Sequence, residues 1–431
     1  MRTLIVVTLL LVLALSAMGP ARAQDVELRI LWYNDGIEGQ IMRDMLDRYQ
    51  EANPGVSVVL DEVAFADIHN ILQTAVEGGD APDIARITQI PRFRDYYLDI
   101  TPYVADPAYW ENSFSPFAQA SMRKGPDDTG IYGLLNQFTV SAPYINVTLF
   151  EQAGVEPLGE GATWEEWVAA AEEVQSVTGV PYAVAIDRSA HRLAGPMISM
   201  GAVFFNEDGS MTIDNEGFRA AVNMLIDWHE RGITPPDVWV GSGDQYVAAR
   251  DYFVNGELVM YMAGSWLING LVNDIGDTFD WAAVPNPTGP GGSTGMPGGA
   301  GMVALAGTDH PEEVGKLMDW LAQPEQMTEW FARTLFLPSH LALVESGVEW
   351  TGNDPANPPD PKAVAALDVF TTEIGKLAEE AYRLQYSPLI DAFNINARDR
   401  IGQVLAGELT LDEAIARIQE AVDEAFAALQ Q

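Results

Sequence analysis

The sequence contains no cysteine, and basic residues are scarce. Without cysteine the chain forms no disulfide bond, offers no thiolate to a metal or substrate, and carries no lipid-modified cysteine near its N-terminus. It has 23 Lys and Arg against 62 Asp and Glu, for a formal net charge of -39. Because nucleic-acid binding depends on Lys and Arg that displace counterions from phosphates, this composition argues against a nucleic-acid partner.

Apolar runs long enough to span a membrane are also missing. The longest run, Leu4 to Ala17, falls short of the roughly 20 residues that cross a bilayer, so an uncleaved membrane anchor is the weaker of two interpretations. Arg2 precedes this run, and Ala21-Arg22-Ala23 follows it as a small-x-small cleavage site. Residues 1–23 are therefore predicted to be a signal peptide that is cleaved after Ala23, and the mature protein is expected in the periplasm.

What is present is a folded chain, with 48% hydrophobic and 10% aromatic residues in 431. Its first part alternates short apolar segments with amphipathic ones. The expected strands are 28–33, 56–60 and 83–87, and the expected helices are 37–52 and 68–76. This β-α-β-α-β order predicts an α/β protein with a mostly parallel sheet, in which ligands bind beyond the carboxyl ends of the strands.

Later segments carry clear local signals. Thr163 with Glu166, and Thr410 with Glu413, fit the capping box that begins a helix. The helix after Thr410 is expected to pack on a core, although its apolar stripe could also serve a partner. The segment 285–301, rich in Gly and Pro, is expected to be a crossing segment or a mobile loop; its glycines lack the spacing of a phosphate-binding loop.

The order of five motifs along the chain resembles a known family. The motifs are Gly79-Asp80-Ala81-Pro82-Asp83-Ile84; Tyr144-Ile145-Asn146 with Leu149-Phe150, Ala153-Gly154 and Thr163-Trp164-Glu165-Glu166; Phe253 to Gly264 with Ser265-Trp266; Val284-Pro285-Asn286-Pro287; and His310-Pro311-Glu312-Glu313 before Trp320-Leu321. In this order the chain resembles the extracellular solute-binding proteins of ATP-binding-cassette (ABC) sugar importers, the group that includes the maltose-binding protein.

The resemblance implies the type II periplasmic-binding-protein fold: two lobes, each a mostly parallel sheet flanked by helices, joined by a hinge. It places lobe 1 in 24–140, mainly lobe 2 with crossing segments in 141–300, a return to lobe 1 in 301–345, and a hinge-proximal helical region in 346–431. It implies that the protein is no enzyme, binds a sugar or oligosaccharide in a cleft between the lobes, and delivers it to a membrane permease. We expect a monomer without cofactor or metal.

A sugar needs aromatic plates for its C–H faces and planar polar groups for its hydroxyls. The residues predicted to provide them in lobe 1 follow strands or precede the first crossing: Trp32, Asn34, Asp35, Thr88, Gln89, Gln137 and Thr139. The alternative for the first three is a buried Trp32 followed by a tight turn. For the others it is ordinary loop hydrogen bonding.

In lobe 2 the strongest candidate is Trp266, because Gly264 admits close backbone approach and the matching Trp of similar proteins stacks on a sugar ring. Arg192 could donate paired hydrogen bonds to vicinal hydroxyls or a carboxylate, or form a structural salt bridge. Gly299 could offer a backbone N–H, or merely flexibility. Tyr386 and Asn394, near the last crossing, complete the predicted set.

Two alternatives concern charge and chemistry. Arg86, Arg92 and Arg94 are expected to neutralise the nearby Asp83, Asp95 and Asp99; otherwise they would favour an acidic sugar, which the negative net charge disfavours only modestly because salt screens it. A secreted glycoside hydrolase with paired carboxylates is the rival function, although no spacing singles out such a pair. The five histidines show no metal-ligand spacing.

Overall fold

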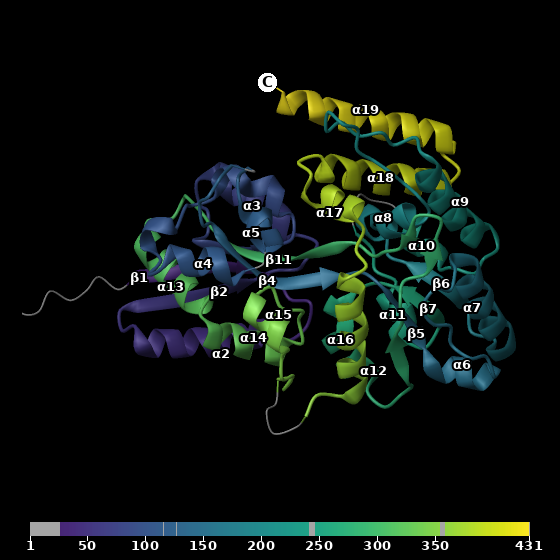
Figure 1. Ribbon diagram of the computed structural model, residues 1–431, viewed down its shortest axis with the longest axis horizontal. Helices are drawn as coiled ribbons and strands as arrows, with labels where there is room; N and C mark the ends of the chain where they lie inside the picture. Colours follow the sequence, from purple (N-terminus) through teal and green to yellow (C-terminus); the bar gives the residue numbers. More distant parts are fainter. Residues whose placement is uncertain (1–25, 115, 126, 241–245, 354–357, 431) are drawn as a thin grey trace, which may run out of the picture.

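The computed structural model describes residues 26–114, 116–125, 127–240, 246–353 and 358–430. The predicted signal peptide and its cleavage site lie outside these residues. The described chain forms two α/β lobes that lie side by side, each built on its own sheet (Figure 1). Within the described part, no helix has both the length and the apolar character needed to cross a membrane.

A five-stranded sheet forms the core of the first lobe. Its strands lie in the order β2 (Val56–Glu62), β1 (Val26–Trp32), β3 (Ile84–Ile87), β11 (Pro297–Ala304) and β4 (Gly133–Val140). β1 pairs in parallel with β2 and β3, which confirms the predicted opening. The flanking helices are α2 (Glu38–Ala52), α3 (Ile68–Gly78), η1 (Ile90–Tyr96), η2 (Thr101–Tyr103), α4 (Pro107–Ser113), α5 (Pro116–Met122), α13 (Pro311–Leu321), α14 (Pro324–Thr334) and α15 (Leu341–Ser346).

The second lobe has a four-stranded sheet. Its strands lie in the order β6 (Tyr182–Ile186), β7 (Leu258–Met262), β5 (Pro143–Asn146) and β8 (Trp281–Ala283). Every residue of β5 and β7 is buried, as expected for strands covered on both faces. The surrounding helices are α6 (Val147–Ala153), α7 (Trp164–Thr178), α8 (Ala190–Ser199), α9 (Glu216–Glu230), α10 (Pro236–Trp239), α11 (Arg250–Val254), η3 (Ser265–Leu267), α12 (Ile268–Ile275) and α16 (Pro361–Ile374).

Both sheets are mostly parallel, as predicted, but each contains one strand that runs against the others. β11 runs antiparallel to β3 and β4, and β5 runs antiparallel to β7 and β8. Parallel neighbours need a crossover connection within one lobe. The strands β4, β5, β8 and β11 instead adjoin passages between the lobes, so the point at which the chain enters each lobe sets their direction.

The chain passes between the lobes three times, and buried polar groups tie these passages together. Ser141 lies between β4 and β5, and Asn286 lies between β8 and β11. The Asn286 side chain donates to Ser141 O at 3.0 Å and to Glu373 Oε2, on α16, at 2.6 Å. The third passage runs from α15 to α16. The segment 285–301 is thus a crossing, with the small hairpin β9 (Thr288–Gly289) and β10 (Gly292–Ser293) inside it.

Helix starts follow the predicted local signals. At α7 the Thr163 side chain accepts from Glu166 N, while the Glu166 side chain accepts from Thr163 N. Thr410 and Glu413 make the same reciprocal bonds at α19 (Leu411–Leu429). Each arrangement satisfies backbone groups that a helix end leaves open. Both predicted capping boxes are confirmed.

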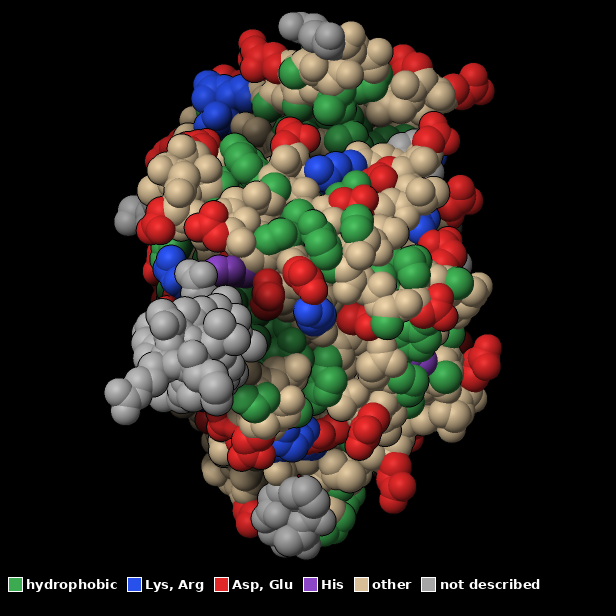
Figure 2. Space-filling model, turned by 90° about the vertical axis from the view of Figure 1, so that its left-hand side faces the viewer, with side chains coloured by type: hydrophobic (Ala, Val, Ile, Leu, Met, Phe, Trp, Pro, Cys, Tyr) green, Lys and Arg blue, Asp and Glu red, His purple; other side chains and the backbone are tan. Residues whose placement is uncertain are grey.

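The last helices stack beside the second lobe. α17 (Glu379–Tyr386) and α18 (Ile390–Leu405) lie near α8, and α19 packs over α18 at the top of Figure 1. The apolar stripe of α19 is buried at Ile415, Ile418 and Val422, so its core role is confirmed. Acidic side chains are spread over the end of the molecule formed by the first lobe, with few basic ones among them (Figure 2).

Candidate binding site between the lobes

The two lobes contact each other through aromatic side chains. The ring of Phe65 lies 5.9 Å from that of Tyr246 in an edge-to-face arrangement, and 5.0 Å from that of Tyr33. Tyr33 follows β1 in the first lobe, whereas Tyr246 belongs to the second lobe. We call the polar and aromatic groups around this contact the interlobe junction. Its members are Tyr33, Asp35, Phe65, Arg86 and Gln137 from the first lobe, and Asp187, Arg192, Tyr246 and Trp266 from the second.

Arg86 holds the first-lobe side of the junction together. Its guanidinium donates to Tyr33 O at 2.6 Å, Gln137 Oε1 at 2.7 Å, Glu38 Oε1 at 3.1 Å and Asp35 Oδ2 at 3.4 Å. Gln137 also donates to Asp35 Oδ2, at 3.2 Å. Arg86 is fully buried, yet Asp35 keeps 19% of its side chain exposed. The network therefore links the fully buried Arg86 to the carboxylate of Asp35, which is still partly exposed to solvent.

The charges in this network balance one another. Burial raises the pKa of Glu38, and the adjacent Arg86 opposes that rise. Burial also works against the charge of Arg86, but Tyr33, Glu38 and Asp35 more than compensate and raise its pKa. A buried charge is stable only when it is paired and hydrogen-bonded. Arg86 meets that condition with Glu38 and Asp35, not with Asp83, Asp95 or Asp99, so the predicted pairing along the chain is wrong.

Trp32 and Asn34 belong to the support of the junction. Trp32 is fully buried, with its ring edge-to-face on Trp330 at 6.0 Å. Its Nε1 donates to Asn34 Oδ1 at 2.9 Å, and that oxygen also accepts from Gly39 N at the start of α2. The structure thus matches the buried-Trp alternative. The Trp32 ring is a core residue and offers no face to a ligand.

Thr88 and Gln89 follow β3, and a histidine fixes their backbone. His69 Nε2 accepts from Thr88 N at 3.3 Å and from Gln89 N at 3.2 Å. Burial, with help from Arg92, lowers the pKa of His69 to about 3, so the ring is neutral and can accept. Gln89 Oε1 accepts from Arg92 at 2.9 Å. Ordinary loop bonding therefore accounts for part of what these residues do.

Gln137, Thr139 and Gly299 lie where β4 meets β11. Gln137 is 1% exposed, and its amide is taken up by Arg86 and Asp35. A Cβ on Gly299 would lie 2.0 Å from Gln137 O, and the φ angle of Gly299 is 151°. Glycine is required there by the close approach of the two strands. Thr139 is 8% exposed and pairs with Gly298 in the ladder.

On the second-lobe side, Arg192 lies over the ring of Trp266. The guanidinium carbon is 3.9 Å from the ring centroid, a cation–π contact. Arg192 also interacts with His191 Nδ1 at 2.7 Å, while its Nε is buried without a hydrogen-bond partner in the described chain. Among those residues it forms no salt bridge within 4.0 Å, which differs from the salt-bridge alternative.

Gly264 sets the place of the Trp266 ring. A Cβ on this glycine would lie 1.9 Å from a carbon of the six-membered ring, so the ring rests against the bare backbone. Ser265, the next residue, accepts from Val140 N at 3.3 Å. That bond ties the Trp266 turn to the end of β4. The predicted reason for a glycine at 264, close approach to its backbone, is thereby confirmed.

Asp187 is a junction residue that the sequence analysis missed. Fully buried, it accepts from Tyr246 Oη at 2.5 Å, Tyr261 Oη at 2.7 Å and Ala249 N at 2.9 Å. Burial raises its pKa, and the charge of Arg192 opposes that rise. Asp187 directly follows β6, so the strand-end rule that selected Asp35 and Thr88 could have found it.

Tyr386 and Asn394 come from α17 and α18. Burial raises the pKa of Tyr386 well above its ordinary value. Asn394 Oδ1 is buried and lacks a hydrogen-bond partner in the described chain. Contact of either residue with a ligand stays a prediction.

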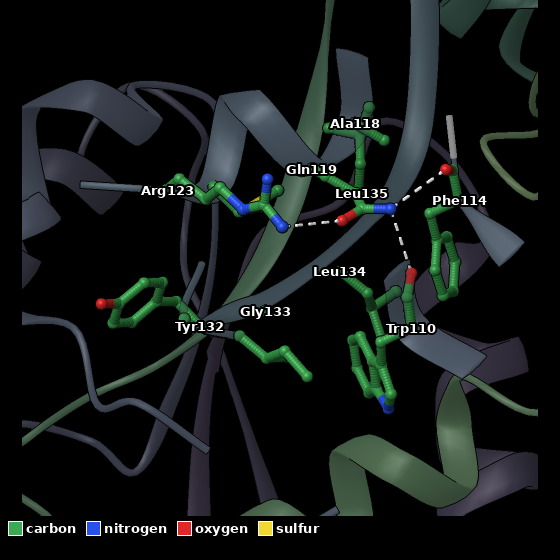
Figure 3. Close-up of a pocket in the computed structure, with 12 residues that line it drawn as sticks. Trp110, Phe114, Ala118, Gln119, Arg123, Tyr132, Gly133, Leu134 and Leu135 are labelled. Atoms are coloured by element: carbon green, nitrogen blue, oxygen red, sulfur yellow. Dashed lines mark hydrogen bonds between the residues drawn. The ribbon is translucent and has the colours of Figure 1, made fainter. Parts of the chain in front are cut away.

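A small cavity lies elsewhere, in the first lobe. Figure 3 shows it between α4, α5 and β4, with Trp110, Phe114 and Leu135 among its lining residues. Its volume of about 30 Å³ suits roughly one water molecule, far below a ligand pocket of several hundred Å³. An open groove of about 590 Å³ beside α3 contains none of the predicted ligand residues. In the described residues, no cluster of His, Asp or Glu could hold a metal ion.

Comparison with known proteins identifies the family. Residues 33–328 match the bacterial extracellular solute-binding proteins, and the chain belongs to this family. The chain is 26% identical over 308 residues to an arabinooligosaccharide-binding protein of Halalkalibacterium halodurans, covering 68% of this chain and 66% of the relative. It is 24% identical over 265 residues to a lactose-binding protein of Rhizobium radiobacter, covering 61% of each. The aligned region therefore spans less than two thirds of both relatives.

Solved structures confirm the two-lobe fold. An ABC substrate-binding protein from Listeria monocytogenes, in complex with cycloalternan, superimposes with a TM-score of 0.77 at 18% identity. The match covers 94% of this chain and all of the other. Because the identity is low, this likeness establishes the fold alone.

Proposed function

We propose that the protein is the carbohydrate-binding subunit of an ABC importer. The observation that carries the proposal is the make-up of the interlobe junction, where the aromatic ring of Trp266 and the planar polar groups Asp35 and Arg192 come from different lobes. A sugar needs such plates and planar groups together. Two relatives are named as an arabinooligosaccharide-binding protein and a lactose-binding protein, and these names support a carbohydrate ligand.

The proposed mechanism uses both lobes. A sugar that contacts Asp35 in one lobe and Trp266 in the other gains its full binding energy only when the lobes are together, so binding shifts a hinge equilibrium toward the closed form. The closed form is then delivered to a membrane permease. Export after cleavage behind Ala23 and a monomeric state belong to the same proposal. Mass spectrometry of the exported protein and light scattering test these two points.

The ligand we propose is an uncharged sugar. In the junction Arg86 faces Asp35 and Glu38, and Arg192 lies close enough to Asp187 to affect its pKa. Arg86 is thus already paired with two acids, and a carboxylate on the ligand would compete with them. Arg192 forms no salt bridge in the described chain, but it lies near the acidic Asp187. Binding of a uronate, and of no neutral sugar, would contradict this part of the proposal.

A thermal-shift screen against neutral and acidic mono- and oligosaccharides tests the function. Ligand at 100 times its dissociation constant adds about 2.7 kcal/mol of stability, so a binder raises the melting temperature measurably. We expect a shift with at least one neutral sugar and intact ligand afterwards. No shift across the panel, or release of reducing ends from an oligosaccharide, would instead favour the rival glycoside hydrolase or another class.

A further inference from the structure

Arg86 stands out among the buried charges because it joins three separate segments of the first lobe. It lies on β3, Tyr33 and Asp35 follow β1, and Gln137 lies on β4. With no side-chain exposure, it cannot itself touch a ligand that enters from solvent. Its ring neighbours hold it in place from the sides: the guanidinium carbon is 4.1 Å from the Tyr33 ring centroid and 4.9 Å from that of Trp32.

Asp35 is the member of this network that reaches solvent. Its Oδ2 accepts from both Arg86 and Gln137, whereas its Oδ1 has no hydrogen-bond partner among the described residues. Backbone N–H groups at Asp35 and Gly36 also donate to Glu38, which fixes the turn from which the carboxylate projects. One oxygen is thus anchored and the other is left open.

We infer that Arg86 is a positioning residue for the carbohydrate site: it anchors Asp35 so that the open carboxylate oxygen accepts a hydrogen bond from a sugar hydroxyl. The inference rests on the proposed function. It assigns a role to a residue that touches no ligand, and it follows the general rule that a binding group needs neighbours that lock its orientation. Gln137 shares the task, because it bonds to the same Asp35 oxygen.

A double-mutant cycle on affinity tests this coupling, using a sugar from the thermal-shift screen. Asp35→Ala removes the carboxylate, and Arg86→Lys keeps the positive charge beside Glu38 but loses the planar fork that bridges Tyr33, Gln137 and Asp35. Each single variant should weaken binding about tenfold, the range for a hydrogen bond to a charged group. The double variant should be no weaker than Asp35→Ala alone, within about twofold, because Arg86 acts through Asp35.

A second variant and a control keep the test decisive if Arg86→Lys folds poorly. Gln137→Met removes the other anchor of Asp35 without changing charge. It should weaken binding about threefold in the native background and not at all beside Asp35→Ala. Arg333→Lys makes the same substitution at a mostly buried arginine that pairs with Asp44 and Glu329, and it should leave affinity unchanged.

The outcomes separate the two proposals. If the unmutated protein binds no sugar, the function fails and the inference fails with it. If it binds, but the effects of Asp35→Ala and the anchor variants multiply, or Asp35→Ala binds normally, the positioning role is overturned while the function stands.

Discussion

The two sides of the interlobe junction are built on different principles. On the first-lobe side, Arg86 shares hydrogen bonds with Tyr33, Glu38, Asp35 and Gln137, and the network is anchored on three segments. On the second-lobe side, Arg192 lies on Trp266 with its Nε unpartnered in the described chain. The contrast indicates a preformed polar surface facing an aromatic one whose hydrogen bonds are less complete. We therefore expect ligand binding to rearrange the second side more than the first.

The largest effect should come from Trp266→Ala, which removes the aromatic plate of the second-lobe side. We expect sugar affinity to fall about a hundredfold, close to 2.7 kcal/mol, because stacking area and the support of Arg192 are lost together. Calorimetric titration measures the change. Trp266→Phe, which retains a smaller plate, should keep part of the affinity. If Trp266→Ala bound sugar with native affinity, the Trp266 ring would lie outside the binding site, and the second-lobe side of the junction could no longer be treated as an aromatic binding surface.

The next effect concerns the first-lobe side and pH. His69 has an ordinary pKa of 6.5 and a pKa of about 3 when folded, so below pH 6.5 the unfolded chain gains a proton that the folded protein does not. Stability is therefore lost as pH falls from 6.5 toward 3, by about 2 kcal/mol at pH 5. Melting at pH 7 and pH 5 should show a smaller loss in His69→Gln than in the native protein.

His310→Gln serves as the control for that experiment, because His310 precedes α13 and lies outside the junction. Its pH dependence should match that of the native protein. If His69→Gln loses as much stability on acidification as the native protein does, the neutral His69 that supports Thr88 and Gln89 is not a fixed part of the first lobe.

A smaller effect is expected from Arg192→Lys. Lysine keeps the charge beside Asp187 but lacks the planar guanidinium that stacks on Trp266 and donates in pairs. We expect about a tenfold loss of affinity with little change in melting temperature. Arg219→Lys, at an exposed ion pair with Asp214, is the matched control in the same lobe. Equal behaviour of the two variants would contradict a ligand-facing role for Arg192.

The smallest effect should come from the helix caps, which belong to neither side of the junction. Thr163→Ala at α7 and Thr410→Ala at α19 each remove a side-chain acceptor from a capping box, and each should cost about 1 kcal/mol of stability. Chemical denaturation gives the stability and titration the affinity, which should not change. A large loss of sugar affinity in either variant would show that residues outside the interlobe junction also determine binding.

Much of the fold could be predicted because its signals are local. The capping residues Thr163 and Glu166 are three positions apart, and the turn 53–55 directly ends the first long helix. The partners of Arg86, by contrast, are 48 to 53 residues away, so near neighbours in sequence were taken instead. The reversed strand in each sheet, β11 and β5, was not predicted for a similar reason, since its direction depends on where the chain re-enters a lobe.

The residues of the interlobe junction were partly predictable. Trp32 and Trp266 both lie near strand ends, but one is covered by Trp330 and the other is only partly buried. The local sequence around either tryptophan does not reveal which residue of a distant helix packs against its ring. Asp35 was predicted from its strand-end position and Arg192 from its residue type, and both lie in the interlobe junction. Asp187 was missed although the same rule applied to it.

The ties between the passages have a consequence for the motion of the lobes. Glu373, 1% exposed, accepts from both the backbone and the side chain of Asn286, which in turn donates to Ser141 O, so hydrogen bonds link the segments beside all three passages. We expect the two lobes to rotate relative to each other about a single hinge axis. Single-molecule distance measurements should then find two discrete inter-lobe separations and no twisted intermediates.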